Sequence, residues 1–244
     1  VVIVACIMDN TNLTSIDLSG NRLCGEDALK PDFTGVQTLA RAIPLAQNLV
    51  VVDISSNGLG PKGAGLLASA VKFSASLTNL SLRGNSIGSE GAVALGKALE
   101  VNASITKLNV LSNSIGTEGG QALVDAAPPQ LQTFCGFEEG QTEANLAGKS
   151  LGPGDAVLLA WELTTGYVSS SMNKLNVLSN SIGDEGYEIL TKVAEEKGIL
   201  TLVGFDEGQT EADLSNKRLG PIDAKLIARE LTTGFVSSSM TSLK

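Results

Sequence analysis

Apolar residues recur along the chain in one fixed pattern of leucine-like positions. The clearest copy is Leu77-x-x-Leu80-x-Leu82-x-x-Asn85-x-Ile87, and its centre alternates between apolar and polar residues. Such alternation is typical of a strand with one buried face, so each copy is expected to contain a short strand. Further copies begin at Leu13, Leu49, Ile105 and Met172.

A helix is predicted after the turn that closes each copy. In the copy above, Gly88 permits positive φ, Ser89 is a candidate helix cap, and Gly91–Leu99 has apolar residues at helical spacing. One strand and one helix cannot cover their own apolar face, so neighbouring units must stack. The equivalent helices are expected at Lys62–Lys72, Glu118–Ala126, Asp155–Leu163, Asp184–Glu196 and Ile222–Leu231.

Two periods are superimposed along the chain. The basic unit is about 28 residues long and is stretched in places. A longer block, 107–173, returns as 174–241, and within it segment 136–144 recurs at 204–212. Each copy of the block carries an insert before an atypical unit in which Lys149 or Lys217 replaces the asparagine. The pattern leaves open whether Glu143–Leu146 is a second strand or a loop on the rim.

These residues resemble the leucine-rich repeat family, and the unit length looks like its ribonuclease-inhibitor-like subclass. The resemblance implies an α/β fold, a curved leucine-rich-repeat solenoid with parallel strands on the concave face and helices on the convex face. It covers 1–244 as a single array of about seven repeats plus a truncated last one. The subclass includes inhibitors, receptor sensor arrays, GTPase-activating proteins and cytoskeletal regulators, so the fold alone selects no function.

Composition narrows the function classes. In 244 residues, 43% are hydrophobic and 18% charged, which is enough to build a core. The net charge of −9 disfavours nucleic acid and anionic lipid surfaces as partners. The absence of histidine removes the commonest general base and metal ligand, so no enzyme activity, cofactor or metal site is predicted. The odd, widely spaced Cys6, Cys24 and Cys135 favour a reduced, cytoplasmic location.

Two local motifs have a plainer explanation in the repeat. Gly58-Leu-Gly60-Pro-Lys-Gly63 matches a dinucleotide-binding pattern, but Gly60 is the turn glycine that every unit carries. The apolar opening Val1–Met8 is shorter than the roughly 20 residues that span a bilayer, and it is expected to be a buried strand or the remainder of a missing start. Because the chain begins with valine, a processed product or a fragment of a longer chain is expected.

The candidate binding surface is the inner face of the predicted sheet. Its side chains point away from the buried leucines and are polar and of mixed sign, with Leu111 and Leu178 expected as the exposed apolar contacts. A solvated sheet without a partner is the alternative interpretation. The proposed partner-binding residues are Asp53, Asn79, Ser81, Arg83, Lys107, Asn109, Leu111, Lys174, Asn176 and Leu178.

Trp161 is a second candidate contact, on the convex side. At the offset of 68 it is equivalent to Arg229, and a position that accepts arginine is not expected in the deep core. An aromatic ring lying over a neighbouring helix is the alternative. The sequence therefore predicts a non-enzymatic scaffold that binds another protein. The alternatives are an architectural subunit of a larger complex, using its convex face or ends, and a GTPase-activating protein of the Ran type.

Overall fold

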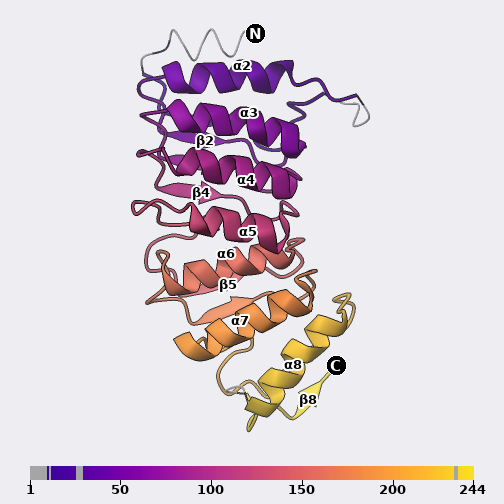
Figure 1. Cartoon of the computed structure of the whole chain (residues 1–244). Coiled ribbons are helices and arrows are strands. Elements are labelled where there is room, and N and C mark those ends of the chain that lie inside the picture. Colours follow the sequence, from indigo (N-terminus) through magenta and orange to yellow (C-terminus); the bar gives the residue numbers. More distant parts are fainter. Residues whose placement is uncertain (1–9, 11, 26–29, 234–235) are drawn as a thin grey trace. The chain divides into compact units, whose positions relative to one another are not determined.

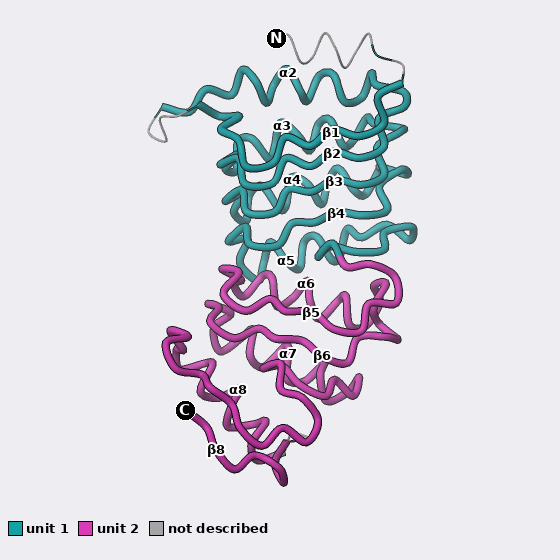
Figure 2. Tube along the Cα trace, turned by 180° about the vertical axis from the view of Figure 1, so that it is seen from behind, with its two compact units in different colours: residues 1–136 teal, residues 137–244 magenta. Residues whose placement is uncertain are grey.

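The computed structural model describes residues 10, 12–25, 30–233 and 236–244. The expected strand at Val1–Met8 and Cys6 lie outside the described residues. The chain forms two compact units, Val1–Gly136 and Phe137–Lys244 (Figure 2), which are described separately below. The expectation of one array through both units therefore stays a prediction.

The first unit alternates short strands with helices. Its strands pair in parallel in the order β1-β2-β3-β4, and its helices stack as a separate layer (Figure 1). All the helices expected here form, each beginning two or three residues earlier than predicted. The elements are β1 (Ser15–Asp17), α2 (Thr34–Ala42), the 3-10 helix η1 (Ile43–Leu45), β2 (Val51–Asp53), α3 (Gly60–Phe73), β3 (Asn79–Ser81), α4 (Gly88–Leu99), β4 (Lys107–Asn109) and α5 (Gly116–Asp125).

The second unit repeats the same alternation. Strand β5 pairs with β6 and β7 pairs with β8, in parallel. The segment Glu143–Asn145, left open by the sequence, is a strand. Between β6 and β7 the chain makes isolated bridges to β6 at Thr201 and Val203. The elements are β5 (Glu143–Asn145), α6 (Pro153–Thr164), β6 (Lys174–Asn176), α7 (Gly183–Lys197), β7 (Glu211–Ala212), α8 (Pro221–Thr233) and β8 (Ser242–Leu243).

The core of the first unit is a set of aligned apolar rows. The register places Val52 beside Leu80 and Leu80 beside Leu108, and all three side chains are buried. Just beyond the strands, Ile54 and Leu82 are fully buried as well. Each coil therefore supplies one wall of the apolar interior of the next, as expected for a stacked repeat.

A buried asparagine fastens each coil to the one before it. The Oδ1 atom of Asn85 accepts the N–H of Asn57 at 2.8 Å, while its Nδ2 donates to the carbonyls of Ile54 and Leu82, both at 2.9 Å. Asn113 does the same for Asn85, accepting its N–H at 2.7 Å. These bonds satisfy backbone groups that the turns would otherwise leave buried and unpaired.

The predicted cap at Ser89 is wrong. Helix α4 begins at Gly88, and the residue before it, Ile87, makes no side-chain capping bond. Instead, the N–H of Ile87 points to the Oδ1 atom of Asn113, 3.4 Å away. The N–H of Gly88 bonds the backbone carbonyl of Asn113 at 3.1 Å, so both the side chain and the backbone of the following coil bond the start of α4.

Where lysine replaces the asparagine, a buried aspartate accepts N–H groups of the turns instead. The carboxylate of Asp223 accepts the N–H of Gly220 and the N–H of Ser179, both at 2.7 Å. Asp155 accepts the N–H of Gly152 at 2.8 Å in the equivalent position. The exchange of one side chain for another explains how these units accept an exposed lysine at the asparagine position.

Candidate protein-binding surface

The outward side chains of the first sheet form two aligned rows. Asn79 pairs in register with Lys107, and Ser81 pairs with Asp53 and Asn109. All five are partly exposed and alternate with the buried residues of the core. Figure 2, which views the molecule from behind, shows β1 to β4 side by side. The structure thus brings together these five of the residues predicted for this face.

Many of these side chains also brace the turn that follows their strand. The Oδ1 atom of Asp53 accepts both the N–H of Ser55, at 2.8 Å, and its hydroxyl, at 2.6 Å. Asp17 accepts the N–H of Ser19 at 2.8 Å, and hydrogen bonds from Ser19 hold the pKa of Asp17 below its usual value. Asn109 makes the equivalent bond at 3.2 Å. This role was missed in the sequence, although the short polar residue two positions before the turn is its signal.

The expected exposure of Leu111 and Leu178 is wrong. Leu111 is only 2% exposed and Leu178 only 4%. In both copies an apolar segment follows beside the strand end, because the N–H of Val110 bonds the carbonyl of Phe134 and the N–H of Val177 bonds that of Leu202, each at 3.0 Å. These apolar positions belong to the interior, so the inner face has no apolar contact there.

A groove lies over strands β5 and β6 of the second unit. Its volume is about 500 Å³. The predicted residues Lys174 and Asn176 lie in it, and part of its lining comes from the two inserts, whose role the sequence did not reveal. The lining residues used below are Phe137, Gln141, Glu143, Lys174, Asn176 and Asp206.

The inserts are closed turns that fix the walls of this groove. The side-chain amide of Gln141 accepts the N–H of Glu138 at 3.2 Å and donates to the carbonyl of Glu143 at 2.8 Å. Gln209 makes the same pair of bonds after Asp206, at 2.9 and 2.8 Å. The turns therefore hold Glu143 and Asp206 in defined positions.

The charge balance of the groove is negative. The ammonium group of Lys174 is paired with the carboxylate of Asp206, and this hydrogen bond raises the pKa of Lys174, with a smaller contribution from Glu143. Two carboxylates thus face one ammonium. Asn145 and Asn176 also line the groove, and their Oδ1 atoms accept the N–H groups of Ala147 and Leu178 at 3.2 and 3.1 Å. This arrangement suits a cationic or hydrogen-bond-donating group of a partner.

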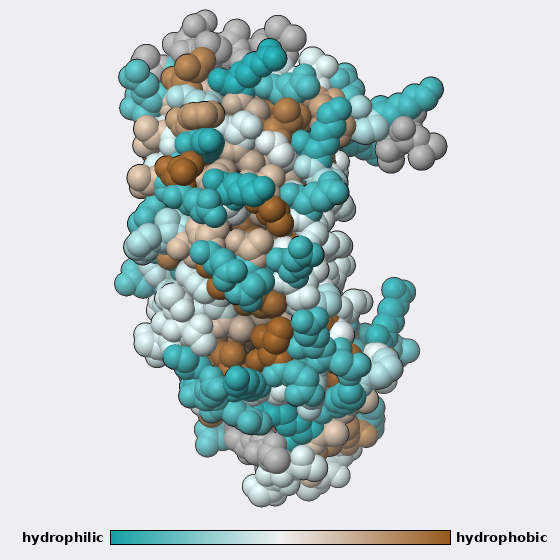
Figure 3. Space-filling model, in the orientation of Figure 1, coloured by the Kyte–Doolittle hydropathy of each residue, from teal (hydrophilic) through white to brown (hydrophobic). Residues whose placement is uncertain are grey.

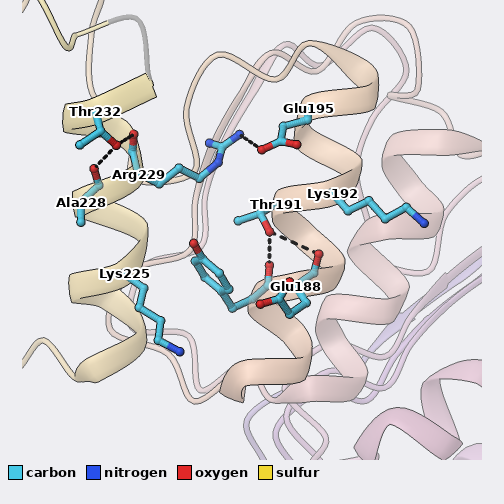
Figure 4. Close-up of a pocket in the computed structure, with 9 residues that line it drawn as sticks. Glu188, Thr191, Lys192, Glu195, Lys225, Ala228, Arg229 and Thr232 are labelled. Atoms are coloured by element: carbon cyan, nitrogen blue, oxygen red, sulfur yellow. Dashed lines mark hydrogen bonds and ion pairs between the residues drawn. The ribbon is translucent and has the colours of Figure 1, made fainter.

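On the helical side, Trp161 of α6 is partly buried rather than fully exposed. Its equivalent Arg229 lies in a hollow of about 670 Å³ between α7 and α8 (Figure 4). The guanidinium of Arg229 lies 3.5 Å from the carboxylate of Glu195, and Lys225 pairs with Asp184. The charges of this hollow therefore neutralise one another.

Some kinds of site do not occur in the part of the chain that the structure describes. Those residues contain no group of three or more acidic or sulfur side chains placed to hold a metal ion. Among them there is also no helix with the length and apolar character needed to cross a membrane. Cys24 and Cys135 are buried free thiols, and burial raises the pKa of Cys24.

The family model described as "Leucine Rich repeat" matches four segments of the chain, at residues 9–30, 46–68, 73–96 and 101–124. No curated protein matches the sequence.

Several solved structures are similar in fold. The tropomodulin C-terminal domain of Caenorhabditis elegans is 12% identical with a TM-score of 0.42, and the match covers 80% of this chain and 90% of that one. Leiomodin-1 actin-binding site 2 is 13% identical with a TM-score of 0.40, covering 80% and 87%. LegL7 from Legionella pneumophila, a leucine-rich repeat-containing protein, is 17% identical with a TM-score of 0.45, covering 99% and 68%. The matched repeats and the strand-helix coils described above are those of an α/β solenoid built of leucine-rich repeats.

Proposed function

We propose that the protein is a non-enzymatic scaffold that binds another protein, with the groove over β5 and β6 as its main docking point. The observation that carries this proposal is the pair of carboxylates, Glu143 and Asp206, held around Lys174 by the closed insert turns. Because the turns fix the backbone beneath these side chains, binding needs little ordering of the scaffold backbone.

The chemistry of the groove favours a cationic side chain of the partner. A lysine or arginine entering it would meet the carboxylates of Glu143 and Asp206. A buried nucleophile or base, which an enzyme would need, has no counterpart among the described lining residues. The groove therefore supports recognition rather than chemistry.

We also assign the chain to the ribonuclease-inhibitor-like subclass and to a reduced, intracellular location. The spacing of 28 residues between Asn57, Asn85 and Asn113 supports the subclass. The buried free thiols Cys24 and Cys135 fit the location.

The test begins with affinity capture from the native source and identification of the partner by mass spectrometry. Binding is then measured for the wild type, for Glu143→Lys and for Glu211→Lys. Glu211 occupies the same repeat position in the duplicated block but does not line the groove, so it is a matched control. We expect about tenfold weaker binding for Glu143→Lys, equivalent to ~1.4 kcal/mol, and unchanged binding for Glu211→Lys. Equal affinity of both variants would exclude the groove.

The inner face of the first unit has its own test. Replacing Arg83 and Lys107 together by Glu changes two partly exposed side chains, so the circular-dichroism spectrum should stay the same. Loss of partner capture is expected if this face contributes. An unaltered pull-down would restrict binding to the second unit.

An architectural role through the convex face is a second candidate, because Trp161 keeps part of its surface accessible on α6. Trp161→Ala should then weaken incorporation into a large assembly, measured by co-sedimentation. It should leave unchanged the affinity for the captured partner, measured as for Glu143→Lys. Normal incorporation of Trp161→Ala would remove this candidate.

A further inference from the structure

Three large apolar side chains of the first unit are exposed at equivalent positions in successive coils. Leu45 is 58% exposed, Phe73 is 68% exposed and Val101 is 60% exposed. They are spaced by one repeat of 28 residues each; Leu45 and Phe73 are the last residues of η1 and α3, and Val101 lies two residues after α4. Figure 3 shows brown, hydrophobic atoms along this edge of the upper helices. Single exposed apolar residues are ordinary, whereas an aligned set is typical of a contact surface.

The backbone beneath this apolar row is held rigidly. The hydroxyl of Ser76 donates to the carbonyl of Ala46 at 2.7 Å, which joins the first two coils. The buried side chain of Asn102 donates to the carbonyls of Val71 and Ser74 at 2.7 and 3.0 Å, which joins the next two. The three side chains are therefore presented at fixed spacing, so a partner would not have to order them.

Basic residues accompany the row. Arg41, Lys72 and Lys97 lie in the last turns of α2, α3 and α4, and all three are exposed. The ammonium of Lys72 lies 5.4 Å from the centroid of the Phe73 ring. No ion pair joins these three cations to a described residue. The exposed Glu100 lies next to Val101, so the three cations leave a net positive strip on a chain of net charge −9, which favours an acidic partner.

A shallow hollow opens beside the row. It has a volume of about 380 Å³ and is lined by residues of α2, η1 and α3 that include Arg41, Pro44, Leu66 and Phe73. An apolar side chain of a partner entering this hollow would meet Leu66 and Phe73 and would leave its flanking carboxylate near Arg41.

We propose that the row of Leu45, Phe73 and Val101 docks an acidic amphipathic helix of a partner protein. Packed neighbouring helices lie about 8–10 Å apart, which sets the spacing of the three apolar residues. An α-helix rises ~1.5 Å per residue, so apolar residues seven positions apart are separated by ~10.5 Å. A helix laid along the row thus places successive apolar residues against Leu45, Phe73 and Val101, and its acidic residues beside the basic strip.

The experiment uses the intact chain and a fluorescein-labelled 21-residue peptide, designed as ~6 helical turns. The peptide has leucine at every seventh position and Glu and Ala elsewhere, and a control peptide has Lys in place of Glu. Binding is measured by fluorescence anisotropy for the wild type and three variants. These are Phe73→Ser with Val101→Ser, Arg41→Glu with Lys72→Glu, and Leu200→Ser. The last is a control that changes an exposed leucine of the second unit.

We expect saturable binding of the acidic peptide, about tenfold weaker binding by each double variant, and unchanged binding by Leu200→Ser. All the changed side chains are exposed, so circular dichroism should confirm that the variants fold. Absence of saturable binding, equal binding of the Lys peptide, or full binding by the double variants would overturn the proposal. Self-association of the chain that Phe73→Ser with Val101→Ser abolishes would also overturn it, because the occupant would then be a second copy.

Discussion

Replacement of Asn85 by Ala gives the sharpest test of how the coils are joined. Asn85 is fully buried and accepts the N–H of Asn57, and it donates to the carbonyls of Ile54 and Leu82. The two carbonyls keep one donor each, because Asn57 also bonds Ile54 and Asn113 also bonds Leu82. The N–H of Asn57 loses its acceptor.

The cost follows from this inventory. A buried N–H left without an acceptor costs about 1–3 kcal/mol, and each lost hydrogen bond to a carbonyl costs roughly 1 kcal/mol. Asn85→Ala should therefore lower the free energy of unfolding by about 3–5 kcal/mol, a large part of the ~5–15 kcal/mol that a typical protein has. The matched control is Asn21→Ala, because Asn21 is exposed and, among the residues that the structure describes, its side chain bonds carbonyls of its own turn, at 2.9 and 3.1 Å. Water can replace those bonds, so a loss below ~1 kcal/mol is expected.

Urea unfolding followed by circular dichroism measures both variants, and native-state hydrogen exchange reports where protection is lost. Exchange should increase first at Asn57 and Leu59, whose N–H groups face Asn85. If the two variants differ by less than ~0.5 kcal/mol, the buried asparagines do not fasten the coils.

Three further predictions concern the core, the helix packing and pH. Leu82→Asp puts an unpaired charge at a fully buried position, so the first unit should unfold; an unchanged melting temperature would refute the repeat register. Gly91→Ala should destabilise, because its Cβ would lie 2.8 Å from that of Ala64, whereas Gly65→Ala meets nothing within 4 Å and should stabilise by up to ~1 kcal/mol; the reverse order in thermal melts would contradict the packing of α3 against α4. Burial raises the pKa of Glu230 in the folded state, so the folded protein binds this proton more tightly than the unfolded chain does. Stability is therefore lost as pH rises from the unfolded pKa through the raised folded pKa. Glu230→Gln should abolish this contribution, and identical pH slopes of the unfolding free energy for the variant and the wild type would count against it.

Much of the fold could be predicted because the repeat leaves a periodic trace. The spacing of Leu80, Leu82 and Asn85 sufficed to locate the strand, the buried row and the turn. Helix starts were predicted one to three residues late, and in the first unit Gly60, Gly88 and Gly116 begin helices without a side-chain cap. The N–H groups of Ile87 and Gly88 bond Asn113 instead, a contact across a repeat that local spacing does not reveal.

The candidate surface could be predicted only in part. Alternation correctly placed Asn79, Ser81 and Lys107 on the outward face, since direction along a strand is a local property. The burial of Leu111 depends on the segment that follows β4, and the groove depends on inserts that have no counterpart in the basic unit. The apolar row was within reach of the sequence, since Leu45, Phe73 and Val101 recur at the repeat spacing, but their exposure required coordinates.

The asparagine bonds also give the array a direction. The side chain of Asn85 reaches back to Asn57, and that of Asn113 reaches back to Asn85, each across 28 residues. A coil emerging from the ribosome therefore lacks acceptors for its turn until the next coil has been synthesised. Each coil should therefore complete its hydrogen bonds only after the next repeat has been translated. The most recently synthesised coil of a growing chain is always the least protected.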